Sequence, residues 1–498
     1  MIILIVLENI FLALNRGSFL DPDLGWRLRL GQYMVQSGHL PTNFVGYNYY
    51  HNLVFVDHQW LSNLLIYLAY EKWGYYSLFA LCIIIFSLTS IILYKICLKK
   101  STFLAANLAV ILFLTTVSQT YYGFRLQYII YLATAIIMYV NEFVTDYIKR
   151  FIIYLILFIL GSNLHGGGFL ILVPVVVLLE STKLFDKETI KAKLKHIGES
   201  ALLAISLLLA MSVNPYGFNF WKTMWDYIVD PYYKANIAEW HSIMTLPINW
   251  IYLTVFAILF FLLTVEKNWK RIERGKLLLF IAVMYFAYSS KRTMPLFVLL
   301  VVPEVCLLLK DGLKKISKKI SIIAIAVALA VAAFILIANS NGKEITLPIK
   351  DPFDISFGSP KMAMEFLKKN IKINGNLYNY YGWGGYITWE YPEQDIFIDG
   401  RAPQAFLTDR RATILREYQE IEANINSKVL EEYNIDYILV RKVSPYQCTI
   451  FDKKVLLAKC NSSKRYVNGI SENYINMQDK NVLDKIFEDP FSVIFKVN

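Results

Sequence analysis

Long hydrophobic runs separated by short polar segments dominate the first two thirds of the chain. Runs such as 78–93 and 320–338 contain no charged residue, and runs of this kind are typical of transmembrane helices. The pattern therefore predicts a polytopic α-helical membrane protein with eleven spans. The predicted spans are residues 2–15, 75–94, 102–120, 126–145, 151–164, 167–180, 198–213, 250–266, 276–290, 294–309 and 320–339.

Three parts of this pattern need interpretation. The fifth and sixth spans are separated only by His165–Gly168, so they are either two helices joined by a tight turn or one broken helix. Residues 60–73 follow a long polar segment, and we interpret them as an amphipathic helix at the membrane interface that leads into the second span. The first run lacks the basic segment and cleavage site of a signal peptide, so we interpret it as a short span.

After residue 341 the hydrophobic segments become short and alternate with polar ones. This change predicts a transmembrane domain over 1–341, with a large first loop at 16–60, followed by a soluble domain over 342–498. The second domain is expected to be a small α/β or α+β layer. Its clearest segments are 437–440 and 492–497, which have strand composition, and 360–370 and 410–426, which have helix composition.

The positions of basic residues predict the orientation of the spans. If the N-terminus is cytoplasmic, the inside loops hold more than twice as many Lys and Arg residues as the outside loops. Basic loops favour the cytoplasmic side of a membrane. We therefore expect a plasma-membrane protein of a bacterium or archaeon, with its N-terminus in the cytoplasm and the first loop and C-terminal domain outside.

Composition and charge narrow the function. Hydrophobic residues make up 56% of the chain and charged residues only 18%, unlike an average soluble domain. The net charge is +11, but the basic residues lie in short clusters between hydrophobic runs, so we expect no nucleic-acid partner. Cys448 and Cys460 flank a short segment of the outer domain, where a disulfide and two free thiols are both reasonable.

The outside loops concentrate acidic, basic, histidine and aromatic residues. Asp21 and Asp23 open the first loop, and such a pair either holds a divalent cation or supplies a general base for an acceptor hydroxyl. Arginine and lysine on neighbouring loops suit a phosphate or pyrophosphate, and aromatic rings suit sugars or a polyprenyl chain. The candidate phosphate ligands are Arg125, Lys291 and Arg292, and the other candidate cavity residues are Trp26, Arg27, Asp57, His58, Trp60, His165, Glu239, Trp240 and His241. If Mg or Mn is bound, its candidate ligands are Asp21, Asp23 and His165.

Each of these groups also has a structural interpretation. Asp21 and Asp23 suit the N-terminus of a helix over 24–37, as capping residues. His165, beside three glycines, suits packing at a helix break. The arginines and lysines suit side chains that extend to the membrane surface, and Tyr and Trp suit anchoring at the membrane edge. Only their collection on one predicted side of the membrane favours a functional site.

The C-terminal domain contains one distinct motif, in which three glycines stand among large aromatic residues. Glycines in this setting indicate positive φ angles or a close approach of the backbone. Asp399 and Arg401 follow with a spacing that suits an ion pair across a turn. The motif is either a lid or acceptor surface or a rigid strand–turn–strand. Its residues are Gly382, Trp383, Gly384, Gly385 and Tyr386.

Seven short motifs follow one another along the chain. They are DPDLGWRLRLG at 21–31, DHQWLS at 57–62, NLHG at 163–166, NPYG at 214–217, EW at 239–240, GWGGY at 382–386 and DGR at 399–401. The first is similar to the first external loop of oligosaccharyltransferase catalytic subunits and protein O-mannosyltransferases. The whole series resembles uncharacterised bacterial members of the same superfamily, the GT-C membrane glycosyltransferases. Two positions depart from that pattern, since Gln59 stands where a Glu is common and Arg27 where a His is common.

The resemblance implies an inverting transfer of a hexose or pentose from a polyprenyl-phosphate donor. The acceptor would be a lipid, glycan or protein outside the cytoplasm, and an acid of the first loop would be catalytic. The alternative is a non-catalytic membrane subunit, or a transporter, in surface polysaccharide assembly. The sequence contains no inverted repeat and its acids lie at the predicted membrane edge, which favours the enzyme.

Overall fold

The computed structural model describes most of the chain as two compact units. The described residues are 9, 21–120, 124–181, 189–229, 232, 236–237, 240–245, 274–339, 351–354, 358–371, 375–404, 406–407, 412–442, 466–467 and 469–498. The helical unit comprises 1–18, 77–221 and 233–349, and the mixed unit comprises 19–76, 222–232 and 350–498. The predicted spans 2–15 (apart from residue 9) and 250–266, Glu239, and the segment with Cys448 and Cys460 lie outside the described residues.

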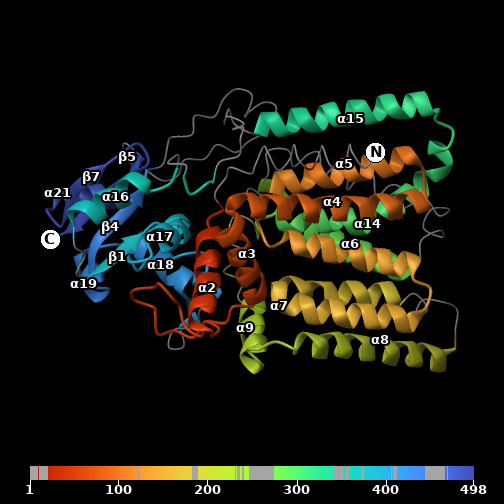
Figure 1. Cartoon of the computed structure of the whole chain (residues 1–498), viewed down its shortest axis with the longest axis horizontal. Helices are drawn as coiled ribbons and strands as arrows, with labels where there is room; N and C mark the ends of the chain where they lie inside the picture. Colours follow the sequence, from red (N-terminus) through yellow and green to blue (C-terminus); the bar gives the residue numbers. More distant parts are fainter. Residues whose placement is uncertain are drawn as a thin grey trace. The chain divides into compact units, whose positions relative to one another are not determined.

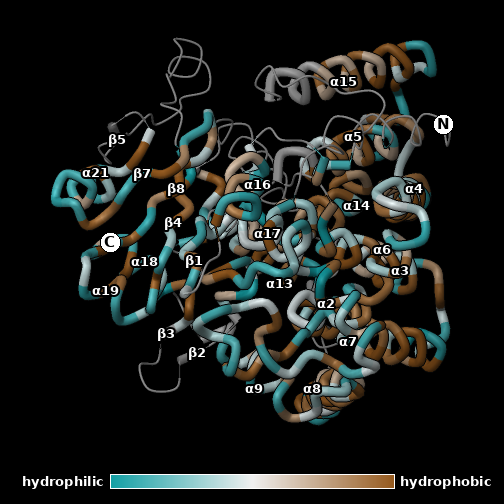
Figure 2. The backbone as a smooth tube through the Cα atoms, turned by 60° about the vertical axis from the view of Figure 1, so that its left-hand side comes forward, coloured by the Kyte–Doolittle hydropathy of each residue, from teal (hydrophilic) through white to brown (hydrophobic). Residues whose placement is uncertain are grey.

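Hydrophobic helices make up the helical unit (Figure 1), and Figure 2 colours them predominantly hydrophobic. Within the described residues, the helices long and apolar enough to cross a membrane are α4, α8 and α7, the last taken over its full length on both sides of a bend at His165. This agrees with a membrane protein, while the total of eleven spans stays a prediction. The helices are α4 (Tyr75–Lys100), α5 (Phe103–Thr120), α6 (Tyr128–Phe143), α7 (Tyr147–Glu180), α8 (Ile190–Met211), α9 (Phe218–Val229, shared with the mixed unit), α13 (Arg274–Ser289), α14 (Met294–Leu313) and α15 (Lys318–Asn339), with 3₁₀ turns at η3 (Ile243–Thr245) and η4 (Lys291–Thr293).

The helix α7 folds back on itself at His165, whose backbone (φ −162°, ψ 70°) is not helical. Arg150 and Glu180 form an ion pair of 2.7 Å, although a straight helix would separate these residues by about 45 Å. Phe158 and Phe169, which lie on opposite sides of the bend, also contact each other, with their ring centres 5.6 Å apart. The two-helix interpretation of this segment is therefore confirmed, and the alternative of one broken helix is wrong.

The two largest corrections to the predicted span boundaries arise because charged residues placed in loops belong to helices. The second span continues to Lys100 instead of ending at 94, and the Lys100 ammonium is held by Glu142 (2.8 Å) and Glu304 (2.9 Å). The seventh span begins at Ile190 instead of 198. There the Thr189 hydroxyl accepts the Ala192 backbone N–H at 3.3 Å and caps the start of α8, whose first turns are basic.

A four-stranded sheet forms the centre of the C-terminal part of the mixed unit. Its strand order is β1-β4-β8-β7; β1 and β4 are parallel and the other pairs antiparallel. The predicted strands 437–440 and 492–497 are confirmed as β4 and β8. The strands are β1 (Asn376–Asn379), β4 (Ile435–Arg441), β7 (Leu483–Glu488) and β8 (Ser492–Val497), beside two small hairpins, β2 (Phe406–Leu407) with β3 (Ala412–Thr413) and β5 (Tyr466–Val467) with β6 (Ile470–Ser471).

Short helices complete the mixed unit. The predicted helix 360–370 is confirmed as α16, whereas the helix predicted over 410–426 is shorter because Thr413 caps its start. Residues 19–76, which the sequence places in the transmembrane domain, group here with the C-terminal residues. The helices are α2 (Leu24–Ser37), α3 (Trp60–Trp73), α16 (Lys361–Asn370), α17 (Gly384–Glu390), α18 (Ile414–Asn424), α19 (Ser427–Glu432) and α21 (Glu472–Asp479), with 3₁₀ turns at η5 (Tyr381–Trp383) and η6 (Ala402–Gln404).

Candidate functional site

The two acids of the first loop stand at the start of α2 but have different surroundings. Asp23 occupies the N-cap position, yet its side chain makes no capping hydrogen bond. Asp21 instead accepts the backbone N–H of Asp23 at 2.7 Å and is 3% exposed. Asp23 therefore marks the start of the helix, as the capping interpretation predicts. Its carboxylate does not cap the helix, so capping does not explain why an acid stands there.

The Asp23 carboxylate is fixed by its neighbours on α2 and remains partly accessible. The indole N–H of Trp26 donates to its Oδ1 at 3.0 Å, and the Arg27 guanidinium lies 3.6 Å from its Oδ2. The Asp23 side chain is 25% exposed, compared with 7% for Arg27. Of the two acids, Asp23 is the more exposed to solvent.

Arg27 and Gln59, the two departures from the family pattern, are partners. The Arg27 guanidinium donates to the Gln59 side-chain oxygen. The Gln59 backbone N–H donates to Asp57 Oδ1 at 3.0 Å, and the Asn63 amide donates to Asp57 Oδ2 at 2.8 Å. These bonds tie the start of α3 to α2. In the sequence, Arg27 and Gln59 are two separate departures from the pattern. The hydrogen bond between their side chains shows that they interact.

The donor set around Asp23 does not fit a divalent cation. One carboxylate oxygen faces the Trp26 N–H and the other faces Arg27, whose positive charge stands where a metal would be needed. Within the described ranges, no group of three or more His, Cys, Asp and Glu residues could hold a metal ion. His165, the third predicted ligand, belongs to the helical unit.

Asp57 is expected to make the mixed unit less stable as the pH rises from about 4 to 6. Burial raises the pKa of its carboxyl to about 6. Hydrogen bonds from Asn63 and Gln59 and the positive charge of Arg27 oppose this rise but are weaker than the effect of burial. Because the folded state then holds the proton more tightly than the unfolded state, stability falls as the proton is lost. The difference in unfolding free energy between wild type and Asp57→Asn should change by about 3 kcal/mol across this window. Denaturant unfolding of both proteins from pH 4 to 7 measures it, and two parallel pH profiles would contradict it.

The glycine motif brings α17 into backbone contact with the start of α2. A Cβ on Gly385 would overlap the Pro22 carbonyl oxygen, and a Cβ on Gly25 would overlap the Gly385 carbonyl oxygen. The motif forms the 3₁₀ turn η5 followed by α17, so the strand–turn–strand prediction is wrong. Its glycines are required by close approach, since neither Gly384 nor Gly385 has a positive φ.

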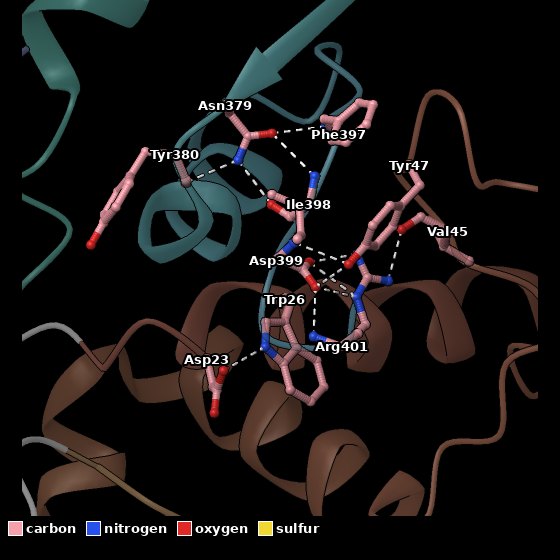
Figure 3. Close-up of polar contacts among 10 residues, drawn as sticks. All are labelled: Asp23, Trp26, Val45, Tyr47, Asn379, Tyr380, Phe397, Ile398, Asp399 and Arg401. Atoms are coloured by element: carbon pink, nitrogen blue, oxygen red, sulfur yellow. Dashed lines mark hydrogen bonds and ion pairs between the residues drawn. The ribbon is translucent and has the colours of Figure 1, made fainter. Parts of the chain in front are cut away.

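The predicted pair of Asp399 and Arg401 is confirmed, and both side chains are completely buried. Three guanidinium contacts of 2.7–3.0 Å join Arg401 to the Asp399 carboxylate, and a fourth reaches the Val45 carbonyl at 2.8 Å. The Tyr47 hydroxyl donates to Asp399 Oδ1 at 2.8 Å, and its ring lies 4.8 Å from the guanidinium carbon (Figure 3). The pair therefore links the first loop to the C-terminal residues.

In the helical unit, the NLHG motif at the bend of α7 meets the NPYG motif, which follows the end of α8. The Asn163 amide donates to the Val213 carbonyl at 2.8 Å, and the Asn214 amide donates to the Ser162 carbonyl at 3.1 Å. The His165 Nδ1 accepts the backbone N–H of Gly168 at 3.2 Å. Through these contacts the two motifs stabilise the bend of α7. This agrees with the structural interpretation of His165, which places it in the packing of a helix break.

Two candidate phosphate ligands lie beside Trp240 and His241. The Arg292 guanidinium carbon is 4.9 Å from the centre of the Trp240 ring, and the Lys291 backbone N–H donates to the His241 carbonyl at 3.0 Å. Lys291 and Arg292 form the turn η4 and are half-buried. The third candidate, Arg125, lies on another turn, before α6.

Two more of the predicted residues, His58 and Trp60, belong to the mixed unit. His58 is buried and Trp60 begins α3. Sequence reasoning missed Tyr47, and it included Gly400 in the DGR motif without giving it a role. Tyr47 is one of many tyrosines in the first loop, and nothing in the loop distinguishes it. Gly400 stands between Asp399 and Arg401, where a glycine suggests only a turn.

The fold is shared with a solved membrane oligosaccharyltransferase, one of the kinds of protein that the motifs resemble. The chain is similar to the Archaeoglobus fulgidus oligosaccharyltransferase in its apo form, with a TM-score of 0.56 and 13% identity over 88% of this chain and 69% of that chain. It also aligns with ArnT from Cupriavidus metallidurans bound to undecaprenyl phosphate, with a TM-score of 0.49 and 12% identity over 99% of this chain and 97% of that chain. No protein-family model and no curated protein matches the sequence.

Proposed function

We propose that this protein transfers a sugar from a polyprenyl-phosphate donor to an acceptor hydroxyl outside the cytoplasm. The observation that supports the proposal most directly is the partly exposed Asp23 carboxylate, held at the start of α2 by Trp26 and Arg27, in a chain with a GT-C fold. A fixed carboxylate with an accessible oxygen is suited to general-base catalysis.

In the proposed reaction Asp23 takes the proton of the acceptor hydroxyl. The acceptor oxygen attacks the anomeric carbon of the sugar, and the bond from that carbon to the phosphate oxygen breaks. The polyprenyl phosphate leaves with the bonding electrons, so the reaction inverts the sugar carbon and needs no covalent enzyme intermediate. Arg27 keeps a positive charge beside the carboxylate before the proton moves.

We assign the donor phosphate to Lys291 and Arg292 of the helical unit. The Arg292 guanidinium lies over the Trp240 ring, and an arginine guanidinium is the side chain best suited to contact two phosphate oxygens at once. The short turn η4 holds both side chains at neighbouring positions. A phosphate bound there would gain charge during the reaction, and these two cations would stabilise it.

Arg292→Ala is expected to weaken binding of polyprenyl phosphate about tenfold or more, because hydrogen bonds to a charged group contribute roughly 1.5–3 kcal/mol. Purified protein in detergent is titrated with undecaprenyl phosphate. Arg416→Ala is the matched control, since Arg416 also lies over an aromatic ring, that of Tyr232 at 5.5 Å, but on α18. Equal affinity of Arg292→Ala and wild type would remove the assignment. Wild type that binds the lipid but transfers no sugar would favour the non-catalytic alternative.

Transfer is expected to continue in the presence of a metal chelator. Arg27 supplies the positive charge at Asp23, and the residues there do not fit a divalent cation. Activity is compared before and after EDTA treatment, followed by addition of Mg or Mn. A loss that either metal restores would contradict this prediction.

A further inference from the structure

We propose that the turn Asp399–Arg401 of the C-terminal segment positions the Asp23 carboxylate for catalysis. This inference rests on the proposed function, in which Asp23 is the general base. It assigns a positioning role to a motif that is far away in the sequence and that neither takes a proton nor binds substrate in the proposed reaction.

The first observation is the closeness of the turn to the carboxylate. A Cβ on Gly400 would overlap Asp23 Oδ1 and would stand 2.9 Å from the Trp26 indole nitrogen. The backbone of the turn therefore lies directly against the hydrogen bond between Trp26 and Asp23. Only glycine leaves the carboxylate in its present place.

The second observation is the support of the indole itself. Trp26 is 2% exposed, and its ring lies 4.4 Å from the Arg27 guanidinium carbon and 5.9 Å from that of Arg401. Figure 3 shows Trp26 next to Arg401, with its nitrogen directed at Asp23. Arg401, on which the ring borders, is itself held by Asp399 and Val45.

The third observation is that α17 and the Asn379 side chain contact the turn and the residues just before it. A Cβ on Gly384 would overlap the Ile398 carbonyl oxygen and would stand 2.6 Å from the Asp399 Cβ, so α17 begins against the turn. The Asn379 side chain accepts the N–H groups of Phe397 (2.8 Å) and Ile398 (3.2 Å) and donates to the Ile398 carbonyl (2.8 Å). An immobile turn that touches a partly exposed carboxylate is suited to hold it in one orientation.

Gly400→Ala tests the proposal most directly. The φ of Gly400 lies outside the left-handed region, so alanine adds a methyl group against Asp23 without backbone strain. We expect kcat for transfer to fall about 100-fold, the effect of a misplacement near 1 Å, with KM for the lipid donor unchanged. Gly312→Ala is the control, because a Cβ there meets nothing within 4 Å.

A second variant tests the proposal without adding atoms at the site, as Gly400→Ala does. Trp26→Phe retains a ring against Arg27 and Arg401 but lacks the donor to Asp23, and kcat should fall about tenfold. In protein labelled with ¹⁵N-tryptophan, the indole signal that Trp26→Phe removes identifies Trp26 among ten tryptophans. That signal should shift in Gly400→Ala and stay in place in Gly312→Ala.

The outcomes separate this inference from the proposed function. If Asp23→Asn abolishes transfer while both Trp26→Phe and a folded Gly400→Ala keep the wild-type kcat, the positioning role is wrong and the function stands. If Gly400→Ala does not fold, the kcat of Trp26→Phe decides alone. If Asp23→Asn transfers sugar at the wild-type rate, the proposed function itself fails.

Discussion

Asp23→Asn is expected to lower the rate of sugar transfer by about 10²- to 10⁴-fold, the usual contribution of a general base. Asparagine has nearly the same shape, and its Oδ1 still accepts the Trp26 N–H, so α2 should begin at the same residue. What the change removes is the ability to take a proton and the charge that faces Arg27. The fall should therefore appear in kcat, with little change in the binding of the donor.

The measurement follows release of polyprenyl phosphate from labelled polyprenyl-phosphate sugars in membranes that contain the natural acceptors. Asp484→Asn, an exposed carboxylate on β7, is the matched control. Asp21→Asn should have a smaller effect, because an asparagine Oδ1 also accepts the Asp23 backbone N–H. An unchanged rate in Asp23→Asn, or an equal loss in Asp21→Asn, would contradict the assignment of Asp23 as the base.

Local patterns in the sequence predict the elements of the first loop to the residue. The helices predicted over 24–37 and 60–73 are α2 and α3, and each ends at a glycine, Gly38 (φ 70°) or Gly74 (φ 64°). Positive φ at such positions ends a helix with no strain in glycine. Helix starts are less predictable where the first turns are basic, as in α8.

Contacts between distant segments could not be predicted in this way. The hydrogen bond from Tyr47 to Asp399 spans 352 residues, and neither local hydrophobic period nor composition contains information about such a pair. Asp399 with Arg401 could be predicted, because two opposite charges two residues apart form a pair locally. The glycines of the α17 motif suggested special backbone geometry, but their partners, Pro22 and Gly25, belong to a segment more than 350 residues away.

The candidate site was predictable in its residue types and only partly in its geometry. The acids of the first loop could be singled out because carboxylates at a membrane edge are unfavourable without a purpose. Their division of roles depends on burial and on one backbone hydrogen bond, from Asp23 to Asp21, which no pattern reveals. The pairing of Arg27 with Gln59 likewise joins two positions that appear independent in the sequence.

Asp399→Asn is expected to lower the free energy of unfolding of the mixed unit by about 3–5 kcal/mol, because it leaves the Arg401 charge buried and uncompensated. Both side chains have no exposed surface, so water cannot replace the lost carboxylate. Asparagine also lacks the Oδ2 that accepts from Arg401 Nε at 3.0 Å and from Arg401 Nη2 at 2.7 Å, because an amide nitrogen cannot accept. The first loop should loosen with the pair, since Val45 and Tyr47 are held by it.

Denaturant unfolding in detergent, followed by tryptophan fluorescence, measures this difference. Glu420→Gln is the matched control, because it breaks an ion pair with Arg416 whose side chains are 49% and 62% exposed, and exposed pairs contribute only about 0–1 kcal/mol. The double variant with Asp399→Asn and Arg401→Met should recover part of the loss, since it removes the unpaired charge as well as its partner. If Asp399→Asn were no less stable than Glu420→Gln, the pair would not stabilise the fold. In that case the link between the first loop and the C-terminal residues would depend on the glycine contacts of α17 with α2.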